Sequence, residues 1–123
     1  MAKIVNYTDA QFYVDSNSFL KETSVIVRNL NRDDKHSFGY DLLKLVRDMV
    51  MDFSLSFSEK NENKKYELAI AAKDKIKLID IQLTLLKDVK VITIKQFSFL
   101  YKHLGLLNTQ LSGWCISLEN KLM

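Results

Sequence analysis

The pattern that decides the fold lies in residues 97–118, FSFLYKHLGLLNTQLSGWCISL. Apolar side chains recur there at alternating spacings of three and four residues. They are Phe97, Leu100, Leu104, Leu107, Leu111, Trp114 and Leu118. This spacing places them on one helix face, as in a helix that packs along others in a bundle. Thr93 and Gln96 just before it have the T-x-x-Q spacing of a capping box. We predict a helix over residues 94–120, with an end near Gly113 as the alternative.

Three earlier segments carry similar periodicity, and we predict helices over residues 8–30, 35–58 and 62–89. The first is expected to begin at a second T-x-x-Q capping box, formed by Thr8 and Gln11. The polar stretches that separate the four segments are short. Successive helices are therefore expected to pack antiparallel.

The composition favours the same fold. The chain has 123 residues, is 47% hydrophobic, and contains three glycines and no proline. So few turn-forming residues argue against a β sandwich or barrel, and no glycine-rich phosphate loop occurs. We predict an all-α protein that forms a single domain over residues 1–123, an antiparallel up-down-up-down four-helix bundle.

The third predicted helix is apolar on two sides. One row has strict three-four spacing: Ala69, Ala72, Ile76, Ile79, Leu83 and Leu86. A second row includes Leu78, Ile81 and Leu85. A surface helix in a four-helix monomer needs only one apolar face. We therefore predict that Leu78, Ile81 and Leu85 lie at an interface between subunits, with a broad core-facing side as the alternative.

Basic residues are concentrated in one part of the chain. The formal net charge is +3, yet residues 60–102 alone carry ten basic and five acidic side chains. All ten of these basic residues are lysines, which suit contact with phosphate more than the reading of bases. The alternative is an ordinary solvated helix face.

Residue types that carry out catalysis are sparse. His36 and His103 fall in different predicted helices, and the single cysteine, Cys115, follows Trp114 as a small packed residue. No Glu-x-x-His pair occurs, so the di-iron design of some bundles is absent. We expect no catalytic residue, no metal and no cofactor. A single cysteine cannot form an intramolecular disulfide, and no leader or membrane-spanning stretch is recognised, so a cytoplasmic location is expected.

Several stretches after His36 are similar to one known family. They are residues 38–43 (FGYDLL), 64–68 (KKYEL), the Ile/Leu-rich stretch 76–86, the turn 91–97 (VITIKQF), and 111–114 (LSGW) with Ser117. Together they resemble the accessory variability determinant (Avd) proteins of diversity-generating retroelements. The related ribosomal-RNA intervening-sequence proteins share the bundle, but their proline- and alanine-bearing second helix is absent here.

The resemblance implies a specific function. Avd proteins form a pentameric barrel of four-helix bundles, bind a reverse transcriptase and the template-repeat RNA, and support mutagenic retrohoming without catalytic activity of their own. We expect RNA, and DNA as a second candidate, to contact a basic surface. The residues expected on that surface are Arg28, Lys44, Arg47, Lys64, Lys65, Lys73, Lys77, Lys87 and Lys95.

Two other classes of function stay open. The first is a protein-binding helical bundle, such as an adaptor of a defence or toxin–antitoxin-like system that does not touch nucleic acid. The second is a small enzyme, for which the sequence offers no recognisable site.

Overall fold

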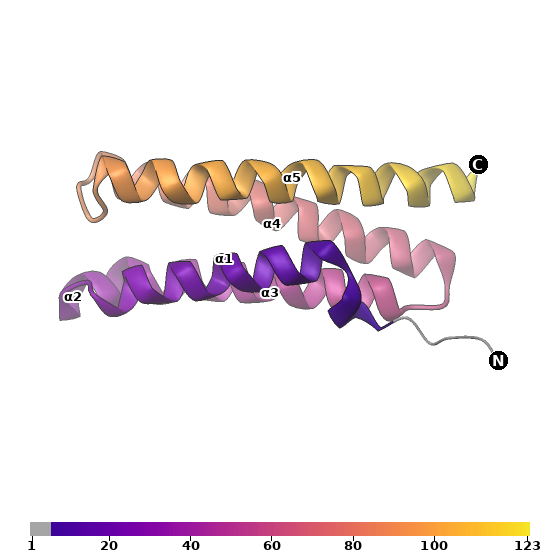
Figure 1. Ribbon diagram of the computed structural model, residues 1–123, viewed down its shortest axis with the longest axis horizontal. Helices are drawn as coiled ribbons and strands as arrows, with labels where there is room; N and C mark the ends of the chain where they lie inside the picture. Colours follow the sequence, from indigo (N-terminus) through magenta and orange to yellow (C-terminus); the bar gives the residue numbers. More distant parts are fainter. Residues whose placement is uncertain (1–5) are drawn as a thin grey trace.

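Four long helices make up most of residues 6–123, which are the residues that the computed structural model describes (Figure 1). They are α1 (Gln11–Arg28), α3 (Tyr40–Ser58), α4 (Glu62–Asp88) and α5 (Ile94–Leu122). Three short elements complete this part of the chain: the 3₁₀ turn η1 (Tyr7–Asp9), α2 (Arg32–Asp34) and the π-helical turn η2 (Lys35–Gly39). The prediction of an all-α protein is confirmed for this part of the chain. The predicted domain starts at residue 1, and its first five residues lie outside the described part.

The long helices pack as a four-membered bundle. α1 lies beside α3, α3 beside α4, α4 beside α5, and α5 beside α1. Figure 1 shows each long helix running opposite to the one before it. The α3–α4 and α1–α5 pairs therefore form opposite sides of the bundle, and the α4–α5 and α1–α3 pairs form the other two.

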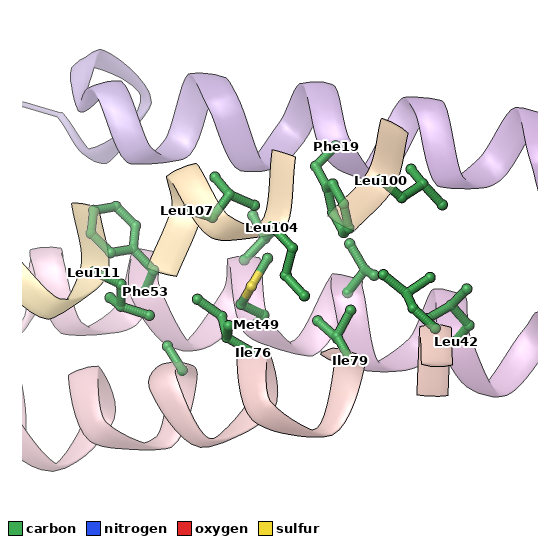
Figure 2. Packing of buried hydrophobic residues seen from close by; sticks show 14 of the residues in the cluster. Phe19, Leu42, Met49, Phe53, Ile76, Ile79, Leu100, Leu104, Leu107 and Leu111 are labelled. Carbon is green, nitrogen blue, oxygen red and sulfur yellow. The ribbon is translucent and has the colours of Figure 1, made fainter. Parts of the chain in front are cut away.

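The core is built from the rows that the spacing predicts (Figure 2). On α5, Leu100, Leu104, Leu107, Leu111 and Leu118 are all buried. Phe97 and Trp114 from the same row are only partly buried, and Cys115 takes the buried position beside Trp114. An α-helix turns every 3.6 residues, so the buried row steps four residues from Leu111 to Cys115 before it reaches Leu118, and Trp114 lies beside it.

The two capping boxes have different outcomes. The box at the start of α5 is confirmed, because the Gln96 N–H donates to Thr93 Oγ1 at 3.0 Å and the Thr93 N–H donates to Gln96 Oε1 at 2.9 Å. The box at Thr8 and Gln11 is wrong. Thr8 lies inside η1, and α1 begins at Gln11 after Ala10, with no side-chain cap.

The start of the second long helix also differs from the prediction. Helical structure begins at Arg32, where the Asp34 N–H donates to Asn31 Oδ1 at 2.8 Å, and then passes through η2 before α3. Gly39 lies in η2 against the end of α1. A Cβ added there would lie only 2.6 Å from Val27 Cγ1, so this close approach requires glycine.

The two glycines of α5 lie in the interior of a continuous helix. The helix continues through Gly113 to Leu122, so no end falls there. A Cβ added at Gly105 or Gly113 would meet no atom within 4 Å. No neighbouring helix packs closely against either glycine, so nothing offsets the cost of glycine in a helix interior. Both glycines border open surface hollows.

Candidate nucleic-acid interface

Three of the predicted basic residues share one face of α4. Lys73 and Lys77 are one turn apart, and Lys87 lies ten residues after Lys77, close to three further turns. Lys73 and Lys77 border a groove between α4 and α5, and Lys87 lies over the Phe97 ring of α5 at 4.5 Å from its centroid. We call this side of the bundle the α4/α5 face.

The groove in this face, called here the α4/α5 groove, has a volume of about 540 Å³. Its lining is a mixture of apolar, aromatic and polar side chains from the two helices. The lining residues are Ile70, Lys73, Asp74, Ile76, Lys77, Asp80, Tyr101, Leu104, Gly105 and Asn108. Leu104 and Ile76 also belong to the buried core, so the floor of the groove is apolar and its rim is polar.

Aromatic side chains of α5 lie beside the lysines of α4. The Phe97 and Tyr101 rings are stacked, with centroids 4.9 Å apart and planes inclined by 25°. Lys87 covers Phe97, while Tyr101 is 43% exposed and lines the groove. A cation on an aromatic face is held by the ring quadrupole, so this contact orients Lys87 along the face.

Two carboxylates interrupt the row of lysines. Asp74 and Asp80 both line the α4/α5 groove, and Lys77 Nζ is 4.0 Å from Asp80 Oδ2. An exposed pair at this distance contributes little to stability. The same carboxylates divide the positive charge into separate points, so the lysines of this face do not form one continuous basic surface.

Lys65 lies elsewhere and has a structural contact. Its Nζ donates to the backbone oxygens of Phe57 at 2.8 Å and Glu59 at 3.0 Å. It also lies 5.5 Å from the centroid of the Trp114 ring. Burial lowers the pKa of Lys65 from its usual value. The ammonium therefore caps the end of α3, where free carbonyl groups favour a cation.

The other predicted basic residues are spread over the bundle. Lys44 borders a groove between α3 and α4, and the Arg47 Nε lies 3.9 Å from Asp48 Oδ1. Lys64 is in the first turn of α4, Lys95 is in the first turn of α5, and Arg28 is in the last turn of α1. These five side chains do not share one face with Lys73, Lys77 and Lys87.

The second apolar row of α4 is exposed in the monomer. Leu78, Ile81 and Leu85 have exposed fractions of 47%, 46% and 53%. Leu78 and Ile81 line a groove of about 350 Å³ with Asp41, Lys44 and Leu45 of α3. We call the side of the bundle that carries Leu78, Ile81 and Leu85 the α3/α4 face.

A second set of exposed apolar residues lies on the opposite side and was missed in the sequence. Glu22 of α1 and His103 of α5 meet across this side, with Oε2 and Nδ1 2.6 Å apart. Val25, Phe99 and Leu106 each lie one helical turn from this pair, and their exposed fractions are 48%, 52% and 48%. We call the side of the bundle that carries Val25, Phe99 and Leu106 the α1/α5 face. The i, i+4 and i+7 spacing of Phe99, His103 and Leu106 in the sequence could have indicated this face.

The remaining candidates for chemistry are held in ordinary contacts. The His36 ring packs edge-on against Tyr40 at 5.3 Å. Cys115 is buried, and burial raises the pKa of its thiol, which keeps it protonated. Among residues 6–123, no three His, Cys, Asp or Glu side chains gather as metal ligands. None of the helices in this part of the chain combines the length and apolar character needed to cross a membrane.

Comparison with known protein families and with curated proteins finds no match to this chain. The similarity to Avd proteins therefore rests on the stretches quoted above, and the function it implies is a proposal.

Proposed function

We propose that this protein is a non-catalytic accessory protein of a diversity-generating retroelement. In this proposal it forms a homo-oligomer, a pentamer by the resemblance, and binds a reverse transcriptase together with the template-repeat RNA. The proposal rests on the similarity to Avd proteins and on the α4/α5 face. The chemistry of copying belongs to the polymerase, and this chain supplies a scaffold.

One observation supports RNA binding above the others. Lys73, Lys77 and Lys87 share a face with the stacked rings of Phe97 and Tyr101. Lysines attract phosphates without reading sequence, and exposed aromatic rings offer stacking surfaces to bases. The α4/α5 face therefore combines the two kinds of contact that proteins use to bind single-stranded nucleic acid.

The two exposed apolar faces support the homo-oligomer. The α3/α4 face and the α1/α5 face lie on opposite sides of the bundle, as the order of helix neighbours requires. Copies that join one face to the other in a head-to-tail manner form a ring when the rotation between them closes. The α4/α5 face takes no part in such contacts, so a ring would repeat it once in each subunit and multiply weak phosphate contacts.

The experiment that tests RNA binding reverses two charges on the α4/α5 face. We expect Lys73→Glu with Lys77→Glu to weaken binding of a structured template-repeat RNA and to reduce the salt dependence by about 0.7–0.9 in slope for each lost contact. The matched control is Lys21→Glu with Lys60→Glu, which makes the same change of charge at exposed positions outside this face. Binding is measured by gel shift and fluorescence anisotropy over a range of salt concentrations.

Equal effects of the two double variants would contradict a specific role for the α4/α5 face. A wild-type protein that binds no RNA at moderate salt would favour the second candidate, a protein-binding bundle adaptor. The exposed apolar faces are the observation that favours this candidate. A reverse-transcriptase gene beside a pair of near-identical repeats, next to the gene for this chain, would support the retroelement assignment.

A further inference from the structure

The α4/α5 groove has open space beside a helical glycine. Gly105 borders the groove, and a Cβ added there would have no atom within 4 Å. Glycine in a helix interior costs about 1 kcal/mol relative to alanine, and no close packing offsets that cost here. The groove volume of about 540 Å³ lies within the roughly 300–1,000 Å³ that is typical of pockets for small organic groups.

The lining of the groove has the three kinds of group that an unpaired nucleotide uses. The partly exposed ring of Tyr101 offers a stacking surface, and its contact with Phe97 fixes its orientation. Lys73 and Lys77 stand at the rim as phosphate partners. Asp74 and Asp80 offer carboxylate oxygens, which accept hydrogen bonds from the amino groups of bases.

The carboxylates distinguish between forms of nucleic acid. A duplex presents its phosphates along the whole contact surface, and its base edges are paired. Asp74 and Asp80 would then face phosphates and repel them. An unpaired base brings donor groups to the same carboxylates, and its phosphates can reach the lysines at the rim.

We propose that the α4/α5 groove binds an unpaired nucleobase of a single-stranded RNA segment. The base stacks on Tyr101 beside Gly105, and the adjoining phosphates contact Lys73 and Lys77. This inference rests on the proposed function, because it names the form of nucleic acid that the α4/α5 face recognises.

The test compares single-stranded and duplex RNA. The probe is a fluorescein-labelled RNA of mixed sequence and about 12 nucleotides, a length within the roughly 4–16 nucleotides that a single-strand-binding OB fold covers. It is used alone and annealed to its complement, and binding is followed by anisotropy. We expect tighter binding of the single strand. Tyr101→Ala should weaken it by about 5- to 100-fold, whereas Tyr101→Phe, which keeps the ring, should not.

A second variant tests the groove without removing any contact. Gly105→Met fills the open space with a good helix former, so we expect a folded protein with a similar loss of single-strand affinity. Gly113→Met is the matched control. It places the same side chain on the same helix, but in a different hollow lined by Phe12 and Trp114. Circular dichroism verifies the fold of each variant.

The outcomes separate this inference from the proposed function. If Lys73→Glu with Lys77→Glu weakens binding but Tyr101→Ala or Gly105→Met does not, the base site is wrong and RNA binding by the face stands. Equal affinity for single strand and duplex overturns the inference as well. If both groove variants impair binding of the reverse transcriptase and leave RNA binding unchanged, the groove takes a protein segment. Absence of any RNA binding by the wild type overturns both proposals.

Discussion

At the scale of single residues, Lys65 shows how the surroundings change the role of a charge. Its position in a lysine-rich stretch predicts a surface contact, and Lys64 beside it is indeed exposed. The Lys65 ammonium instead ends at the carbonyl groups of Phe57 and Glu59 and near the Trp114 ring. The residues that bind it come from the preceding helix end and from α5. The local sequence carries no signal for such a contact.

Lys65 is expected to contribute to stability. We predict that Lys65→Met, which keeps the apolar stem and removes the ammonium, lowers the free energy of unfolding by about 1–2 kcal/mol, because two charge-assisted hydrogen bonds are lost. The measurement is the urea midpoint by circular dichroism. Lys64→Met is the control, with an expected change within about 0.5 kcal/mol. Equal midpoints for the two variants would contradict the capping role.

At the scale of elements, helices were predictable where local signals agree. α4 and α5 lie within two residues of the expected bounds at both ends. Their apolar spacing and the Thr93–Gln96 box are read from neighbouring residues. In the structure Asn61 also caps α4, because its Oδ1 accepts from the Lys64 N–H at 3.1 Å. The turn η2 was not predictable, since it depends on the approach of Val27 to Gly39 across a chain reversal. The start of α1 was misplaced because the T-x-x-Q spacing begins at Thr8 inside η1, and its glutamine, Gln11, is the first residue of α1.

The approach of α1 to η2 gives an element-scale prediction. Gly39→Ala is expected to lower the free energy of unfolding by about 1–3 kcal/mol, because the new methyl group would press on the buried Val27 side chain. Thermal and urea unfolding measure the change. The double variant Gly39→Ala with Val27→Ala should lose less free energy of unfolding than the sum of the two single losses, because the smaller side chain at residue 27 makes room for the new methyl group.

Gly105→Ala is the control for this substitution. Its added methyl group meets no neighbour, so a gain of up to about 1 kcal/mol is expected from helix propensity. A Gly39→Ala variant as stable as Gly105→Ala would show that η2 can shift to make room for the methyl group.

At the scale of the whole molecule, the sequence predicted the types of site residue better than their grouping. The excess of lysines after residue 60 was visible, and three of the nine basic candidates gather on the α4/α5 face. Grouping depends on which helices become neighbours, and the 3.6-residue period alone leaves that open. The α4/α5 groove was missed for the same reason, because Gly105 and Lys73 meet only after α4 and α5 pack.

The two apolar faces give a prediction for assembly. If the wild-type protein forms the proposed ring, we expect Ile81→Asp on the α3/α4 face and Phe99→Asp on the α1/α5 face each to yield a monomer, because each buries a charge in one half of the contact. Mixing the two variants should yield a dimer, since each retains the face that the other has lost. Light scattering after gel filtration measures all three samples.

Other results would contradict head-to-tail assembly. A wild-type protein that is monomeric at micromolar concentration would contradict the proposal of an oligomer. A Phe99→Asp protein that keeps the wild-type mass would point to contacts between two α3/α4 faces.

The contact between α1 and α5 also affects how the protein folds during its synthesis. Glu22 meets His103 and Asp15 meets Gln110, so the first long helix is completed by the last. Until α5 has left the ribosome, α1, α3 and α4 have no fourth helix to cover their apolar rows. Such a nascent three-helix stage exposes core surface and is prone to aggregate. Slow translation of the segment after residue 93 would prolong that stage. The loop between α4 and α5 is short, so α5 can dock as soon as it has emerged.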